Sequence, residues 1–184
     1  MELDDCIRYR KSVRNFTTKT LPFEKVGEIL DAARFAPSSG NAQNWRFIII
    51  KENKEKVAVC CEGSEWVSTA QYLIVVCSDQ ERMKQLYGPR GEALYAVQNC
   101  SAAIQNMLLK AHDLGIASCW IGQFDEHKLN ELLGIPQTIR PQAIIAYGYG
   151  DEPEMQQRES LKNNVYFEKW GSKESGKSFL PLFK

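Results

Sequence analysis

One long helix governs what this 184-residue sequence can fold into. Between residues 91 and 114, apolar side chains recur every three or four positions, which predicts a helix of about 22 residues and roughly 33 Å. Small side chains, among them Ala96 and residues 101–103, surround much of its circumference. Because a helix that is apolar on more than one side needs several packing partners, we expect it at the centre of the fold or against a second subunit.

Short apolar runs rich in Ile and Val alternate with helical patterns along the rest of the chain. These runs predict strands at residues 46–51, 71–78, 116–121 and 142–149. Helical spacing, caps and breakers predict helices at residues 2–10, from near Pro22 to before Pro37, at 54–61 and at 125–134. A turn is expected at residues 87–91. Because strands and helices interleave, we predict an α+β fold with a mixed central β-sheet flanked by helices.

The C-terminal part of the chain is polar but carries scattered aromatic residues. A free tail would not need these rings, which are Tyr166, Phe167, Trp170, Phe179 and Phe183. We therefore predict a single domain over residues 1–184, in which residues 151–184 form an extension that packs on its own subunit or on a partner.

The charges of the chain balance, with 23 Lys plus Arg and 23 Asp plus Glu. A neutral chain is a poor candidate for nucleic-acid binding, which relies on clustered cations. No apolar run approaches the roughly 20 residues that cross a bilayer, and no signal peptide is visible, so we expect a cytoplasmic protein without membrane contact. The six cysteines are expected to be free, buried thiols. With only two histidines, we expect no metal site.

Three segments carry side chains suited to ligand binding. Residues 6–23 hold five cations and no acid, with Ser12 among them, and such a segment can bind a dianion. Residues 37–45 bring serine and asparagine groups beside Gly40, which suits hydrogen bonding to a polar ring or a polyol. Residues 115–125 place small residues at a strand end, where Gly122 can offer its N–H to a planar ligand. Each segment also has a purely structural interpretation: a solvated helix end for residues 6–23, a capped turn for residues 37–45 and a tight strand-to-helix connection for residues 115–125.

Missing motifs exclude several enzyme classes. The chain has no G-x-G-x-x-G between a strand and a helix, no phosphate-binding P-loop motif and no G-x-S-x-G nucleophile elbow. No acid–base pair stands out either. Any catalysis is therefore expected to be carried by a bound cofactor, with protein groups supplying position and electrostatics.

In this order and spacing, the three segments resemble the FMN-dependent nitroreductase family. Residues 10–16 (RKSVRNF) are similar to its N-terminal R-[RK]-S-x-R-x-[FY] motif. Residues 36–45 (APSSGNAQNW) are similar to its A-P-S-[SA]-x-N-x-Q-P-W loop, with Asn44 in place of the frequent Pro. Residues 115–125 (GIASCWIGQFD) are similar to its G-[LI]-[GA]-[ST]-C-W-I-[GT]-x-F-D segment. The resemblance covers residue 2 to about residue 170.

The resemblance implies an intertwined homodimer with two FMN sites at the subunit interface. Residues 10–12 of one subunit would hold the phosphate and ring edge, and the 37–41 loop would come from the other subunit. The Gly122 N–H would lie near flavin N5. Arg158 matches a late phosphate-binding arginine, although Gln156 replaces its usual basic companion. The implied cofactor-binding residues are Arg10, Lys11, Ser12, Arg14, Pro37, Ser38, Ser39, Asn41, Ile121, Gly122 and Arg158.

The implied activity is an oxidoreductase that takes hydride from NADH or NADPH onto flavin N5. Its small-molecule acceptor would be a nitroaromatic, a quinone or a similar compound. No side chain is expected to act as a catalytic group of its own. Two alternatives remain open: a flavin-binding sensor or carrier that does not turn over, and the same fold with dehalogenase or flavin-cleaving chemistry.

Overall fold

The computed structural model describes residues 1–151 and 153–173, and the chain divides into two compact units, Met1–Pro153 and Glu154–Lys184. The second unit contains the short helix α7 (Leu161–Asn164), and the rings of Tyr166 and Trp170 lie 4.6 Å apart within it. Phe179 and Phe183 lie outside the described residues. Where the extension packs stays a prediction.

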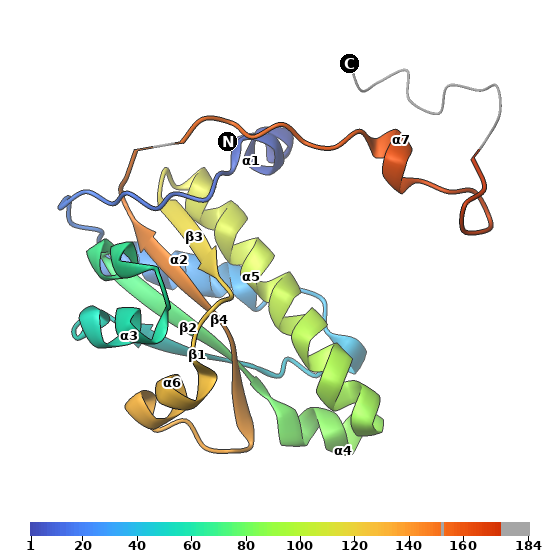
Figure 1. The fold of residues 1–184 in the computed structure, drawn as a ribbon, viewed down its shortest axis with the longest axis horizontal. Helices are drawn as coiled ribbons and strands as arrows, with labels where there is room; N and C mark the ends of the chain where they lie inside the picture. The colour runs from blue at the N-terminus through green and yellow to red at the C-terminus, as the bar shows by residue number, and fades with distance from the viewer. Residues whose placement is uncertain (152, 174–184) are drawn as a thin grey trace. The chain divides into compact units, whose positions relative to one another are not determined.

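The first unit is built on a four-stranded sheet (Figure 1). Its strands are β1 (Trp45–Ile50), β2 (Tyr72–Asp79), β3 (Ala117–Ile121) and β4 (Ile139–Gly148). They lie in the order β1-β2-β4-β3, and every neighbouring pair is antiparallel. The parallel pairing expected of a mixed sheet is limited, in the described part of the chain, to an isolated bridge between Ser12 and Ser118. The α+β class with helices on both faces is as predicted.

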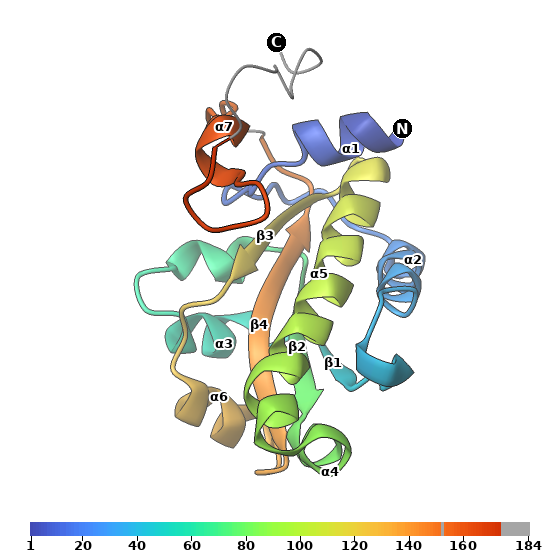
Figure 2. The ribbon, with the colours of Figure 1, turned by 90° about the vertical axis from the view of Figure 1, so that its right-hand side faces the viewer.

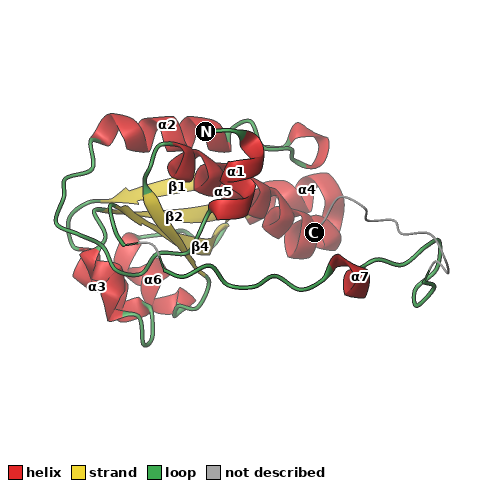
Figure 3. Cartoon of the chain, turned by 90° about the horizontal axis from the view of Figure 1, so that it is seen from above, coloured by secondary structure: helices red, strands yellow, loops and turns green. Residues whose placement is uncertain are grey.

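Two pairs of helices cover the two faces of the sheet (Figure 3). On one face, α2 (Phe23–Ala33) and α5 (Ala96–Asp113) enclose a core. On the other face, α3 (Lys54–Cys60) and α6 (Glu126–Leu133) enclose a second core. Strand β2 is buried along nearly all its length, because both of its faces are covered. Residues 91–114 thus lie against the sheet, as the many-sided apolar pattern predicted.

The segment before α5 differs from the predicted turn. It forms helix α4 (Gln80–Arg90), a break at Gly88 with φ of 62°, and a π-helical turn over Gly91–Tyr95. The helix was missed because its sequence is mostly polar and only Gln80 and Met83 are buried. The predicted turn residues are nevertheless where the chain changes direction. Gly91 has no room for a Cβ, which would lie 2.3 Å from the Met83 carbonyl oxygen.

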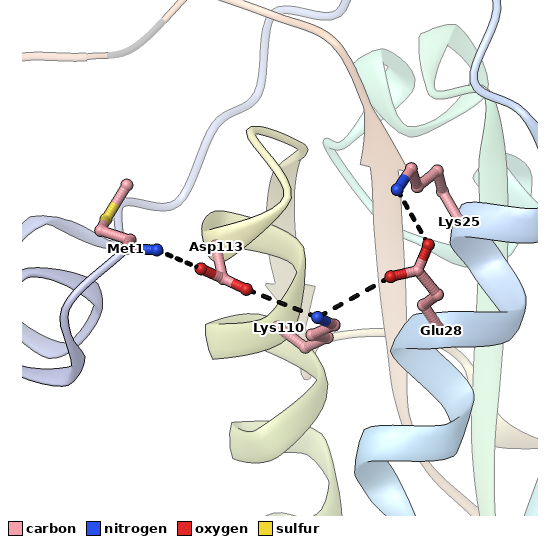
Figure 4. A network of polar contacts seen from close by, with 5 residues as sticks. All are labelled: Met1, Lys25, Glu28, Lys110 and Asp113. Atoms are coloured by element: carbon pink, nitrogen blue, oxygen red, sulfur yellow. Dashed lines mark hydrogen bonds and ion pairs between the residues drawn. The ribbon is translucent and has the colours of Figure 1, made fainter.

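The N-terminal helix α1 (Leu3–Tyr9) lies beside the C-terminal end of α5 (Figure 2). An ion-pair network holds it there (Figure 4). The N-terminal ammonium lies 2.7 Å from Asp113, whose second oxygen lies 3.4 Å from Lys110. Lys110 reaches Glu28 on α2 at 3.8 Å. The ammonium holds the pKa of Asp113 below its ordinary value. These exposed pairs contribute little to stability. They link the N-terminus of the chain to α5 and α2.

All six cysteines are free and buried, as their apolar surroundings predict. In the described residues, no helix combines the length and the apolar character needed to cross a membrane. No group of three or more His, Cys, Asp or Glu side chains in the same residues is arranged to hold a metal ion.

Candidate functional site

Residues 10–16 run beside the sheet and join it at two points. The Val13 N–H donates to the Ser118 carbonyl at 2.9 Å, and Phe16 bridges to Gly150 just past β4. Gly150 has to be glycine for this contact, since a Cβ there would lie 2.2 Å from the Asn15 carbonyl oxygen. Residues 10–16 are therefore extended backbone attached to β3 and to the residues just past β4. The alternative interpretation, in which these cations only solvate a helix end, does not account for this attachment.

A small cationic pocket lies where this segment meets β3. Arg10 and Lys11 line it from one side, and Ser118, His112 and Gly150 are among its other walls. Its volume is about 120 Å³. Pockets that enclose a drug-sized ligand usually measure roughly 300–1,000 Å³. One chain thus offers a socket that fits an anionic group such as a phosphate, and it does not enclose a whole cofactor.

Arg14 and Cys119 belong to the same two segments, residues 10–16 and β3. The Arg14 guanidinium lies 6.0 Å from the centre of the Trp66 ring, so it covers an aromatic face at the edge of the segment. Burial raises the pKa of the Cys119 thiol. The positive charges of Arg14 and Arg10, and a hydrogen bond with the Ser12 side chain, lower this pKa and offset part of the effect. The thiol is consequently neutral and is not an activated nucleophile.

Just past the end of β3, the outer strand to which residues 10–16 are attached, lies a stretch of exposed backbone. Gly122 is exposed, and a Cβ built on it would find one atom at 4.0 Å, the Trp120 Nε1. Ile121 is 5% exposed, and its side chain packs in the core with Leu129. A planar ligand here would therefore meet the backbone of these two residues, whereas the Ile121 side chain serves the core.

The loop of residues 37–44, here named the amide loop, is held in place by a buried asparagine of α5. The Asn99 Oδ1 accepts from the Ser39 N–H at 3.0 Å and from the Ser39 hydroxyl at 3.2 Å. The Asn99 Nδ2 donates to the Asn44 Oδ1 at 2.7 Å. Asn99 is 4% exposed and Asn44 is fully buried. Asn44, which replaces the frequent Pro of the family motif, therefore acts as an anchor of this loop.

The amide loop is also wound into an unusual backbone. Gly40, Asn41 and Gln43 all have positive φ, between 48° and 56°. The Ser38 hydroxyl accepts from the Gln43 N–H at 3.1 Å, and the Asn41 Oδ1 accepts from the Gln43 side chain at 2.9 Å. Left-handed backbone in non-glycine residues persists where the surroundings fix it, and it is frequent at binding sites. Pro37 begins this loop and is exposed.

The sequence motifs did not include Asn99 or Tyr87, although both shape the amide loop. The Tyr87 hydroxyl lies against Gly40, where a Cβ would meet it at 2.0 Å. No local signal marks Asn99, because the same helix carries further amides at Gln98, Gln105 and Asn106. No motif marks Tyr87.

The structure separates the predicted residues into two clusters within one chain. Arg10, Lys11 and Ser12 lie at the start of β3, near the end of α5 that carries His112, and Gly122 follows the other end of β3. The amide loop lies at Asn99, 13 residues earlier on α5, which is about 20 Å along the helix axis. Arg158 lies in the second unit and is exposed. One chain alone thus does not gather the predicted set into a single pocket.

Comparison with known proteins matches the part of the chain that contains the three motif segments. The family model described as Nitroreductase family matches residues 7–59 and 58–149. A putative NADH dehydrogenase/NAD(P)H nitroreductase of Archaeoglobus fulgidus is 33% identical over 180 residues, with 91% of this chain and 100% of that protein covered. An FMN reductase (NADPH) of Bacillus subtilis is 25% identical over 182 residues, with 88% and 73% covered. An iodotyrosine deiodinase of Thermotoga neapolitana is 27% identical over 178 residues, with 82% and 90% covered.

Solved structures show the same fold. A nitroreductase family protein of Clostridium difficile superposes with a TM-score of 0.82 at 28% identity, covering 92% of this chain and 99% of that one. A nitroreductase family protein of Streptococcus pneumoniae gives a TM-score of 0.83 at 25% identity, covering 90% and 100%. The fold, the motifs and the family match agree, and the chain belongs to the nitroreductase family.

Proposed function

We propose that this protein is an FMN-dependent oxidoreductase that takes hydride from NADH or NADPH and reduces a nitroaromatic, a quinone or a similar small acceptor. The observation that carries this proposal is the cationic socket lined by Arg10 and Lys11 at the start of β3, with the bare backbone of Gly122 just past the other end of that strand. A phosphate at one end and a flat ring at the other match this arrangement. Membership of the nitroreductase family and relatives named FMN reductase support the same cofactor.

The chain's own residues would bind and orient the cofactor. Arg10 and Lys11 would neutralise the phosphate, with Ser12 supplying a hydroxyl. The Gly122 N–H would lie near N5 of the ring, and nearby cations would stabilise negative charge on the reduced ring. Bound FMN would supply hydride acceptance and two-electron delivery. In this proposal the protein binds the cofactor and FMN carries out the chemistry, so no protein nucleophile is required. A neutral Cys119 thiol agrees with this.

The proposed site needs two subunits. Ser38, Ser39 and Asn41 lie about 20 Å along α5 from the socket of their own chain, so the amide loop would complete the site of a partner. The second unit, with Arg158, would pack on its own subunit or on the partner and approach the phosphate from there. A cytoplasmic location stays a prediction.

Two other functions remain candidates. The iodotyrosine deiodinase relative favours reductive dehalogenation on the same fold. A flavin-binding sensor or carrier would bind FMN through the same residues without turnover. Both share the cofactor site with the main proposal, and they differ in what happens after FMN binds.

Spectroscopy of the purified protein tests the cofactor first. We expect visible flavin absorbance, or its appearance when FMN is added to colourless protein. A protein that stays colourless and takes up no FMN would refute the proposal.

Anaerobic titration then separates the candidates. Bleaching of the flavin by NADH or NADPH, followed by reoxidation with a nitroaromatic or a quinone, is the expected result. Reoxidation by an iodinated phenol alone would favour the dehalogenase. Bound FMN that neither nicotinamide reduces would identify a sensor or carrier.

A further inference from the structure

We propose that Arg90, held by Tyr95, selects electron acceptors that are planar, aromatic and anionic. The inference rests on the proposed function, because it assigns a substrate class to the same flavin site. Three observations carry it: the contact of Tyr87 with the amide loop, the contacts that fix Arg90, and the charge that Arg90 keeps.

The first step links the tyrosine pair to the amide loop. The Tyr87 hydroxyl lies against Gly40, which stands between Ser39 and Asn41. The Tyr87 ring meets the Tyr95 ring edge to face, with centroids 5.5 Å apart and planes at 76°. Tyr87 is 37% exposed, so one side of the pair is open to a ligand. An aromatic wall therefore adjoins the loop that would line the flavin site of a partner.

The second step places Arg90 on this wall. The Arg90 Nε donates to the Tyr95 hydroxyl at 3.2 Å, and its guanidinium carbon lies 5.6 Å from the Tyr95 ring centre. The backbone below is fixed by Pro89, by the Gly88 break and by Gly91, which has no room for a side chain. Arg90 is thus a positioned group despite being exposed.

The third step concerns charge. The neighbouring acid, Glu92, lies 3.4 Å from Lys84. Among the described residues, no carboxylate lies within ion-pair distance of Arg90. Its two terminal nitrogens remain available in a planar fork that suits a carboxylate or a phosphate. The unneutralised Arg90 guanidinium lies against the Tyr95 ring, and this ring meets Tyr87 beside the amide loop. This arrangement suits a flat acceptor with an anionic group.

The test compares two acceptors that differ in charge. Nitrobenzene and 4-nitrobenzoate share the reacting nitro group, and reduction of either to the nitroso compound consumes one NADH and one proton and releases water. The FMN-loaded wild type should prefer 4-nitrobenzoate. Arg90→Met should lower kcat/KM for 4-nitrobenzoate by roughly 10- to 100-fold, mainly through KM, with a much smaller effect on nitrobenzene.

Further variants test the positioning. Arg90→Lys keeps the charge but loses the fork, and should restore part of the preference. Tyr95→Phe keeps the ring but removes the hydroxyl that holds Arg90, and should raise KM for 4-nitrobenzoate with little change in kcat. Arg82→Met removes an exposed cation from the same helix and leaves the Glu92–Lys84 pair intact, so it should leave the ratio between the acceptors as in wild type.

The outcomes separate two failures. If Arg90→Met changes kcat/KM equally for both acceptors, or for neither, the inference is overturned. The proposed function still stands in that case, provided that NADH reduces the bound flavin. A rise in KM for NADPH relative to NADH, without discrimination between the acceptors, would assign Arg90 to the donor phosphate and would also overturn it. A protein that binds no FMN would refute the proposed function and this inference together.

Discussion

Asn99 holds the amide loop at two points, Ser39 and Asn44. It is buried, it accepts both hydrogen bonds of Ser39, and it donates to Asn44. Asn99→Ala would leave the Ser39 N–H and the Asn44 Oδ1 without these partners in a buried place. We expect a loss of about 2–3 kcal/mol in the free energy of unfolding, measured by urea titration, and weaker FMN binding, measured by fluorescence.

A second asparagine of the same helix provides the control. Asn106 donates one side-chain hydrogen bond to the Ala32 carbonyl at 3.2 Å, away from the amide loop. Asn106→Ala should cost about 1 kcal/mol of stability and leave the FMN affinity unchanged. Equal FMN affinities for the two variants would contradict the role assigned to Asn99.

At the scale of elements, two glycines test how residues 10–16 are attached. A Cβ at Gly150 would lie 2.2 Å from the Asn15 carbonyl, whereas a Cβ at Gly27 on α2 would meet nothing within 4 Å. Gly150→Ala should therefore cost about 1–3 kcal/mol and weaken FMN binding. Gly27→Ala should stabilise the fold by about 0.5–1 kcal/mol, because it removes a glycine from a helix. Thermal unfolding with and without FMN measures both; a Gly150→Ala protein with wild-type FMN affinity would argue against the attachment.

Elements with strong local signals were predictable from the sequence. The Val26, Ile29 and Ala33 spacing predicted α2, and Asp125 caps α6 as expected, since its carboxylate accepts from the Lys128 N–H at 3.0 Å. Helix α4 was missed because its stability comes from a buried Met83 and from its neighbours instead of an apolar stripe.

For the candidate site, the motifs pointed to residues 10–12, the amide loop and Gly122, but they did not point to the groups that contact the amide loop from other elements. Asn99 and Tyr87 act on the loop across 60 and 47 residues of sequence, respectively, and no local pattern encodes such contacts. The antiparallel order of the sheet was equally out of reach, since strand pairing depends on contacts between distant segments.

At the scale of the whole molecule, buried thiols should make stability fall in alkali. Burial raises the pKa of Cys61 to about 11 and those of Cys77 and Cys100 to about 12, from an ordinary value of 9.0. Above pH 9 the unfolded chain releases protons that the folded chain keeps. Each thiol should thus remove up to about 1.4 kcal/mol per pH unit from the free energy of unfolding until the pH reaches its folded pKa.

Urea titrations under reducing conditions between pH 7 and about pH 11 measure this slope. Cys77→Ala should be less stable at pH 7, because it leaves a cavity. Its slope above pH 9 should nevertheless be shallower than that of the wild type by about 1.4 kcal/mol per pH unit. A slope equal to that of the wild type would show that Cys77 ionises equally in both states.

The division of the site between two ends of α5 leads to a test on mixed dimers. If the socket of one subunit is completed by the amide loop of the other, Arg10→Glu alone and Ser39→Ala with Asn41→Ala alone should each abolish or weaken both sites. A mixed dimer of these two proteins would keep one intact site, formed by the unaltered socket of one subunit and the unaltered loop of the other. Half the wild-type FMN content per dimer is therefore expected at limiting FMN, measured by absorbance after purification on two different affinity tags.

The matched control places all three substitutions on one subunit and pairs it with the wild type. In a shared site, each of the two sites then contains one defect, so no high-affinity FMN should bind. If each subunit instead builds its own site, this control dimer keeps one intact site and the first mixed dimer keeps none. The two dimers thus give opposite results under the two arrangements. The separation of about 20 Å along α5 between the socket and the loop is the reason to expect the shared one.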